Sequence, residues 1–247
     1  SVTQNVSYPL EIRKFPKSEI DDRVAEVLAL VDLTDMASKM ATQLSGGQQQ
    51  RCSLARAIVS SPRLLLFDEP LSNLDLKLRE QMRLELKRIQ NEVGITSIYV
   101  THDQAEALVM SDDIIVMSKG NIEQTGAPLE IYSQPVNKYV SNFIGVANLL
   151  EARISKLTSP GHAEAVVSYG DMTVQLPCKI GVGVKEGDDT TISIRPENVH
   201  AIREKENDQC IEGKVENAIF LGNHVDCRVS WGNFEWKVIA HPRDRLK

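Results

Sequence analysis

The sequence predicts an α/β domain followed by a small all-β domain. In the first half, short apolar runs alternate with amphipathic helical patterns, which is typical of a parallel sheet with crossover helices. From Asn148 onward, apolar and polar residues mostly alternate, which is typical of antiparallel strands with one buried face. The pattern changes near Gly145, so we expect two domains, residues 1–144 and 145–247.

The first three helices are predicted before residue 94, two of them from apolar residues at helical spacing. The first spans residues 19–31, where Ser18 and Asp21 resemble a capping box. The second runs from about 48 to 59, and the third, a long one, runs from about 78 to 93, where Gly94 closes it.

Short apolar runs mark the strands between these helices. Residues 64–67 and 97–100 show no polar alternation, so we expect strands buried on both faces of a parallel sheet. Residues 103–110 are expected to form a helix, and 114–117 another strand of the same sheet. Residues 128–145 are expected to be a helical connector.

The second half has the pattern of a small barrel. Apolar residues alternate with polar ones in residues 172–176, 225–231 and 234–238. Gly232-Asn233, between the last two runs, predicts a hairpin turn. We expect the aromatic side chains of those two runs to lie in the core of a compact β domain.

Composition excludes several classes of protein. The formal net charge of −6 argues against a general nucleic-acid binder, which would normally be basic. No apolar run approaches the length of a membrane span. The four cysteines form no Cys-x-x-Cys pair, so we expect small buried side chains rather than a zinc or redox site. They are Cys52, Cys178, Cys210 and Cys227.

Residues 44–51 read Leu-Ser-Gly-Gly-Gln-Gln-Gln-Arg and open the second helix. The glycines allow the backbone to approach a ligand closely, and a helix N-terminus offers free N–H groups to a phosphate. Ser45 adds a hydroxyl to this anion cradle. Ser-Gly-Gly alone would more often be a flexible turn, but the full string of fixed positions favours a phosphate site.

Asp68 and Glu69 follow the apolar run 64–67. Ligands bind at the carboxyl edge of open α/β sheets, where this pair would lie. Asp68 can bind magnesium directly or through water, and Glu69 can orient or deprotonate a water molecule. The alternative is a solvated acidic turn held by Pro70.

His102 ends a second predicted strand, so in a parallel sheet it lies at the same edge as Glu69. A neutral imidazole there can donate to a phosphate oxygen or a water molecule. The turn Ser72-Asn73-Leu74-Asp75 is expected to cap the long helix, because Ser, Asn and Asp are good caps.

Together these motifs resemble the ATP-binding subunits of ABC transporters. Ser45–Gln48 matches the signature loop of that family and Leu64–Glu69 its Walker B strand. Ser72–Asp75 matches the D-loop and His102 the switch histidine. The second half resembles the OB-like regulatory (TOBE) domain of the maltose, polyamine and iron importers, mainly through Ser193-Ile-Arg-Pro-Glu197.

The resemblance implies a fold in parts. Residues 1–144 would be a partial ATPase domain with a P-loop NTPase-like parallel sheet. Its parts would be a helical subdomain (about 1–47), the rest of the catalytic core (about 48–127) and a helical connector (about 128–144). An OB-like β-barrel, residues 145–247, would follow and would be truncated at its C-terminus.

The resemblance also implies a dimeric ATPase that uses ATP and Mg²⁺. Ser45, Gly46, Gly47 and Gln48 would contact the γ-phosphate bound by a second copy. Asp68 would serve magnesium, Glu69 would be the general base, and His102 would steady the γ-phosphate. Asp75 would link the two sites across the dimer.

The sequence departs from the family pattern because it contains no Gly-x-x-x-x-Gly-Lys-Ser/Thr loop. By resemblance, this Walker A loop and the glutamine loop would lie upstream of Ser1. We therefore expect an internal fragment of a longer subunit, and we expect this fragment alone neither to bind ATP tightly nor to hydrolyse it.

The leading functional hypothesis is a bacterial ATPase subunit that energises import of a sugar, a polyamine or ferric iron. Its expected partners are a second copy and an integral membrane permease, with an extracytoplasmic solute-binding protein acting indirectly and no nucleic acid. It would be cytoplasmic and peripheral on the inner face of the membrane, with residues 1–44 toward the permease. The alternatives are a DNA-repair or chromosome ABC ATPase, and a regulatory binding or dimerisation module formed by residues 148–247.

Overall fold

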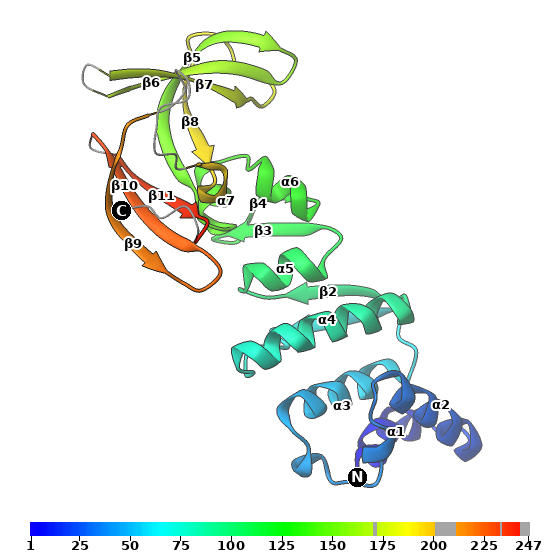
Figure 1. The fold of residues 1–247 in the computed structure, drawn as a ribbon. Coiled ribbons are helices and arrows are strands. Elements are labelled where there is room, and N and C mark those ends of the chain that lie inside the picture. The colour runs from blue at the N-terminus through cyan, green and yellow to red at the C-terminus, as the bar shows by residue number, and fades with distance from the viewer. Residues whose placement is uncertain (170–171, 201–210, 233, 243–247) are drawn as a thin grey trace. The chain divides into compact units, whose positions relative to one another are not determined.

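A computed structural model describes residues 1–169, 172–200, 211–232 and 234–242 (Figure 1). The chain divides into two compact units, residues 1–114 and 115–247. The domain boundary expected near Gly145 stays a prediction. Within the described ranges, none of the helices is both long enough and apolar enough to cross a membrane.

The first unit begins with a small group of helices. They are α1 (Val2–Ile12), α2 (Lys17–Leu30), two 3₁₀ turns (Thr34–Met36 and Ala41–Gln43) and α3 (Gly46–Ile58). The helix predicted at 19–31 is therefore present as α2, but its predicted cap is wrong. The N-cap residue is Pro16, which makes no side-chain cap bond, so Ser18 already lies inside the first turn.

The predicted parallel pairing is confirmed in the first unit. Strand β1 (Leu64–Asp68) leads through α4 (Leu76–Val93) to β2 (Thr96–Val100), and α5 (Gln104–Met110) follows. The two strands pair in parallel from Leu64 opposite Thr96 to Asp68 opposite Val100. Gly94 ends α4 with a left-handed φ of 65°, as its position after the apolar stripe predicts.

The expectation that these strands are buried on both faces is wrong. Leu65 is 7% exposed and belongs to the same core as α3 and α4, whereas its neighbour Leu66 is 73% exposed. Ile98 of β2 is 52% exposed as well. Successive side chains of a strand point to opposite faces, and only one face of the pair packs against helices of this unit.

Strand β3 (Ile114–Ser118) forms where a strand was predicted. It pairs with β4 (Asn121–Gly126), and its membership of the sheet that contains β1 and β2 stays a prediction. Lys119 and Gly120 connect β3 and β4 and both have positive φ, 49° and 82°. The predicted connector is helical and consists of α6 (Pro128–Ser133) and α7 (Lys138–Phe143).

The rest of the second unit is antiparallel β structure. A four-stranded sheet has the order β7-β6-β5-β8 and a three-stranded sheet the order β11-β10-β9. The strands are β5 (Asn148–Ser159), β6 (His162–Tyr169), β7 (Met172–Lys179), β8 (Asp189–Ile194), β9 (Lys214–Phe220), β10 (Val225–Trp231) and β11 (Phe234–Ala240). Among the described strands, no pairing between the two sheets closes the expected barrel.

Both sheets contribute to one apolar core. Trp231 and Trp236 are 6% and 8% exposed, and Phe234 packs against them, so the core role expected of these aromatic residues is confirmed. Trp231 lies opposite Phe234 in the ladder, which confirms the predicted hairpin, although Asn233 lies outside the described residues. Asn148 of β5 joins the sheets through two 2.8 Å hydrogen bonds with the backbone of Lys237.

The cysteines behave as small apolar side chains where they are described. Cys52 and Cys227 are buried and Cys178 is half-buried, and all three are free thiols. Burial raises the pKa of each of these three thiols. Cys210 lies outside the described residues.

The segment Ser193–Glu197 anchors the helical connector of the second unit. Arg195 is 6% exposed, and its guanidinium donates to the carbonyls of Tyr132 (2.8 Å), Ser141 (2.9 Å) and Val146 (3.2 Å). It also lies 4.2 Å from the centre of the Tyr132 ring. The hydroxyls of Ser193 and Ser141 are 2.7 Å apart. This part of the motif therefore holds α6 and α7 against β8.

Candidate active site

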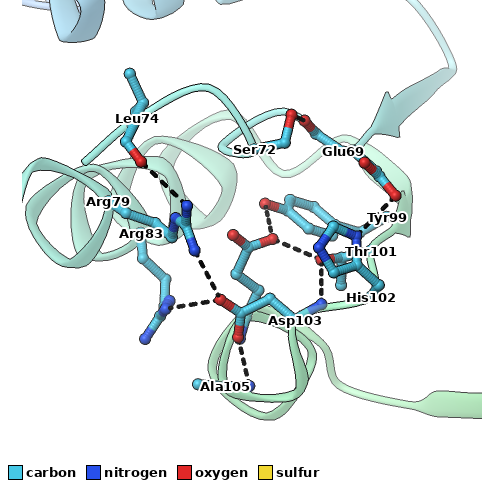
Figure 2. Close-up of polar contacts among 11 residues, drawn as sticks. Glu69, Ser72, Leu74, Arg79, Arg83, Tyr99, Thr101, His102, Asp103 and Ala105 are labelled. Atoms are coloured by element: carbon cyan, nitrogen blue, oxygen red, sulfur yellow. Dashed lines mark hydrogen bonds and ion pairs between the residues drawn. The ribbon is translucent and has the colours of Figure 1, made fainter. Parts of the chain in front are cut away.

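Glu69 and His102 meet at the carboxyl edge of the β1–β2 pair. The backbone N–H of Glu69 donates to Val100 O at 2.9 Å, which extends the parallel ladder by one residue. His102 stands two residues beyond β2, and its Nδ1 is 2.8 Å from Glu69 Oε1 (Figure 2). The parallel strands thus bring together two side chains that are 33 residues apart in the sequence.

Both members of this pair face solvent. The side chain of His102 is 74% exposed and that of Glu69 46% exposed. The hydrogen bond and the negative charge of Glu69 raise the pKa of His102 above its ordinary value. The pair is thus open to a substrate, and the imidazole retains a proton to a higher pH than a free histidine.

The backbone at Glu69 is held in an unusual conformation. Its φ is 45°, in the left-handed region that non-glycine residues rarely adopt. Such a residue costs about 1–2 kcal/mol, so the surrounding bonds must hold it. The ladder bond to Val100 O is one, and the Ser72 hydroxyl donates to the Glu69 carbonyl at 3.0 Å (Figure 2).

Asp68 is the last residue of β1 and is exposed. Magnesium in nucleotide sites is typically bound by one or two carboxylates together with water and phosphate oxygens. An exposed carboxylate oxygen beside Glu69 is the kind of hard ligand that this ion prefers. Over the residues that the structure describes, no three or more His, Cys, Asp and Glu side chains group as around a metal ion.

A buried carboxylate lies behind His102. Glu106 is 2% exposed, and its Oε2 accepts hydrogen bonds from Thr101 Oγ1 (2.8 Å) and Tyr99 OH (3.1 Å). Burial and the neighbouring Glu106 raise the pKa of Tyr99 well above its usual range. The sequence analysis missed this cluster, because a Glu in a short helix is normally exposed. The Thr-x-x-x-x-Glu spacing was the available signal.

Asp103 connects the histidine segment to α4. Its Oδ1 caps α5 by accepting from Ala105 N (2.9 Å) and Glu106 N (3.2 Å). Its Oδ2 forms ion pairs with Arg79 (3.5 Å) and Arg83 (3.8 Å) of α4. Figure 2 shows the two arginine side chains reaching Asp103 from one side and Ala105 of α5 on the other.

Arg79 also reaches the turn before α4. Its guanidinium donates to Leu74 O at 3.0 Å, and Asp75 next to Leu74 is the N-cap of α4. The Asp75 side chain accepts from Leu78 N at 3.0 Å, so its predicted capping role is confirmed. Arg79 therefore bridges the Ser72–Asp75 turn to the residue that follows His102.

Ser45 and Gln48 start α3 as a capping box. Ser45 Oγ accepts from Gln48 N (3.4 Å), and Gln48 Oε1 accepts from Ser45 N (2.9 Å). Ser45 and Gly46 are exposed and Gly47 is buried. Among the described residues, no hydrogen bond or ion pair joins this turn to Glu69 or His102.

The two glycines have a packing role that the sequence analysis missed. A Cβ at Gly46 would stand 3.2 Å from a methyl group of Leu74. A Cβ at Gly47 would stand 3.2 Å from both Leu78 and the sulfur of Met82. The first turn of α3 thus lies directly against the start of α4, which leaves little room for any side chain.

Both halves of the chain match known proteins. Residues 1–72 match the ABC transporter family and residues 192–246 match the TOBE domain. A spermidine/putrescine import ATP-binding protein PotA from Clostridium acetobutylicum is 44% identical over 236 residues, which are 96% of this chain and 64% of that protein. PotA of Mesorhizobium japonicum is also 44% identical, with coverage of 93% and 61%.

A solved structure is similar over part of the chain. It is cbiO1 from Clostridium perfringens, part of the ABC transporter complex cbiONQ, with a TM-score of 0.51 and 33% sequence identity. The likeness covers 54% of this chain and 53% of that one.

The chain spans less than two thirds of the length of these curated relatives. The findings give no support to the alternative of a DNA-repair or chromosome ATPase. Over 96% of its length the chain is similar to an import ATP-binding protein, and the ABC transporter family and the TOBE domain are matched in its first and second halves.

Proposed function

We propose that this chain belongs to a subunit that hydrolyses ATP to energise solute import through an ABC transporter. The observation that carries the proposal is the 2.8 Å contact between Glu69 and His102 at the carboxyl edge of a parallel strand pair. An acid and an imidazole in contact, both open to solvent, form an acid–base pair that can act on a water molecule and on a phosphate.

Each residue at this edge has a proposed role. Glu69 accepts the proton of the attacking water, and His102 donates a hydrogen bond to the γ-phosphate. Asp68 would hold Mg²⁺, which when bound would neutralise charge on the phosphate oxygens. The main contribution of such a site is positioning and charge stabilisation.

The signature turn and Asp75 are proposed to act across a dimer. Ser45 and Gly46 are exposed at the start of α3, where free N–H groups favour an anion. We propose that Ser45, Gly46, Gly47 and Gln48 contact the γ-phosphate of ATP bound by a second copy. Asp75 would lie at the interface between the two copies.

The hydrolytic roles are tested with a form of the subunit that includes a Walker A loop. Because general base catalysis contributes about 10²–10⁴-fold, we expect Glu69→Gln to lower kcat at least about a hundredfold while ATP affinity stays near the parent value. His102→Ala is expected to lower kcat as well. Asp113→Asn changes an exposed carboxyl outside the site and serves as the control. Parent-like turnover in Glu69→Gln would refute the base role.

We propose a polyamine as the transported solute, because the PotA relatives are named for spermidine/putrescine import. The test measures uptake of labelled spermidine by cells that lack the gene, before and after the intact gene is restored. We expect restored uptake to be competed by putrescine but not by maltose or ferric iron. Restoration of maltose or iron uptake instead would contradict the proposal.

The permease contact is proposed to involve residues 1–44, which would place the subunit at the cytoplasmic face of the membrane. Tyr8 and Ile12 lie one turn apart on α1 and are 58% and 62% exposed, so together they offer an apolar contact surface to a partner. We expect the double substitution of both by Ser to abolish co-purification of the permease. Leu129→Ser, at a site 76% exposed in α6, is the control. Unchanged co-purification of the double variant would exclude this contact.

A further inference from the structure

We propose that Thr101 is the positioning residue for His102, an inference that rests on the proposed function of the site. The side chain of Thr101 touches neither Glu69 nor the imidazole in the described contacts. Its hydroxyl instead fixes the backbone of the segment that carries His102.

The hydroxyl of Thr101 uses both of its hydrogen-bonding capacities. As a donor it binds Glu106 Oε2 at 2.8 Å, and as an acceptor it binds Asp103 N at 2.9 Å (Figure 2). Thr101 and Asp103 are the two neighbours of His102. One hydroxyl group therefore ties together the residues on both sides of the histidine and attaches them to a buried carboxylate.

The anchor of this arrangement is rigid. Glu106 is 2% exposed, and the same Oε2 also accepts from Tyr99 OH at 3.1 Å. The ring of Tyr99 packs against Phe67 of β1, with ring centres 5.6 Å apart. The carboxylate is thus held through both strands that end at the site. A buried carboxylate with two donors also resists displacement, because leaving it unsatisfied is costly.

His102 depends on this support because its own side chain is 74% exposed. Its hydrogen bond to Glu69 is the one described contact of the ring, so the position of its backbone decides where the ring stands. Thr101→Val keeps the shape of the side chain but removes the donor and the acceptor. Thr101→Ser keeps the hydroxyl. A displacement of about 1 Å at a catalytic group can cost a hundredfold in rate.

The first test measures the pKa of His102 in this chain by NMR of its imidazole. We expect Thr101→Val to lower the His102 pKa toward its ordinary value, because the contact with Glu69 is lost. Thr101→Ser should keep the parent pKa. Ser97→Ala is the matched control, since it removes a β2 hydroxyl that donates to Ile95 O away from Glu106 and should leave His102 unchanged. A parent-like His102 pKa in Thr101→Val would overturn the proposal.

The second test is ATP turnover by a form that includes a Walker A loop. Because misplacement acts on the reacting geometry, we expect Thr101→Val to lower kcat about tenfold or more with little change in KM, and Thr101→Ser to restore it. A lowered pKa with unchanged kcat would support the positioning role and contradict the catalytic role of His102. An unchanged pKa with lowered kcat would contradict the positioning role alone.

Discussion

Replacing Arg195 by methionine tests whether the Ser193–Glu197 motif is chiefly structural. Methionine retains much of the apolar stem but none of the donors. The change leaves the carbonyls of Tyr132, Ser141 and Val146 without the guanidinium that binds them. These carbonyls lie in α6, in α7 and two residues before β5, so three backbone segments lose one common anchor.

The magnitude follows from these contacts. A hydrogen bond from a charged donor is worth about 1.5–3 kcal/mol, and stacking on an aromatic ring adds about 0.5–2 kcal/mol. The full sum would overstate the loss, because the buried guanidinium gave up its hydration and the contacts are not additive. Removing one partner of a buried charged site typically costs about 3–5 kcal/mol, which is the loss in unfolding free energy that we expect.

Urea unfolding followed by tryptophan fluorescence measures this loss selectively. Trp231 and Trp236 are the only two tryptophans of the chain, and both lie in the core of the second unit. With a slope of about 2 kcal/mol per molar urea, the midpoint should fall by about 2 M. Arg153→Met is the control, because that side chain is 70% exposed. A loss in Arg195→Met no larger than in Arg153→Met would refute the structural role.

Three further predictions concern single residues. Asp75→Ala should lower the unfolding free energy by about 1 kcal/mol through loss of the helix cap. Asp75→Ser should keep the parent stability in a thermal melt, because serine also caps a helix. If the carboxylate acts across the dimer, Asp75→Ser should still lower ATP turnover. Asn148→Ala should lower the unfolding free energy measured in urea by about 2–4 kcal/mol, because two partly buried hydrogen bonds to the Lys237 backbone are lost. Glu69→Gln should lower the His102 pKa measured by NMR. In the parent, the ion pair of protonated His102 with Glu69 is present below the raised pKa and is lost as the pH rises through it. Without the carboxylate charge, the imidazole should lose its proton at a lower pH.

Local signals predicted much of the first unit. The apolar stripe of α4, its Asp75 cap and its Gly94 terminus all depend on residues within the helix or next to it. The start of α2 was predicted two residues late, because Pro16 rather than Ser18 precedes the first turn. Boundaries that depend on one residue's conformation are less visible in a sequence than a repeated apolar spacing.

Features that depend on distant partners were less predictable. An apolar run indicates a strand, but it does not state which faces will be covered, and Leu66 is largely exposed. The pairing of β3 with β4 across Lys119 and Gly120 was not predicted either. In both cases the element itself was predicted, and what the sequence did not indicate concerned its neighbours.

The candidate site divides in the same way. The proximity of Glu69 and His102 followed from a general rule, that parallel strands bring their carboxyl ends to one edge. The bonds among Thr101, Glu106 and Asp103 did not, because nothing in a seven-residue helix shows that one of its carboxylates is buried. The packing of Gly47 against Met82 likewise needed the fold.

The central claim is that one nucleotide is shared by the edge that carries Glu69 and His102 and by the Ser45 turn of a second copy. The most direct test is a crystal structure of the Glu69→Gln subunit, in a form with a Walker A loop, grown with ATP and Mg²⁺. We expect His102 of one copy and Ser45 of the other to lie within hydrogen-bonding distance of the same γ-phosphate. A γ-phosphate that contacts neither residue would contradict it.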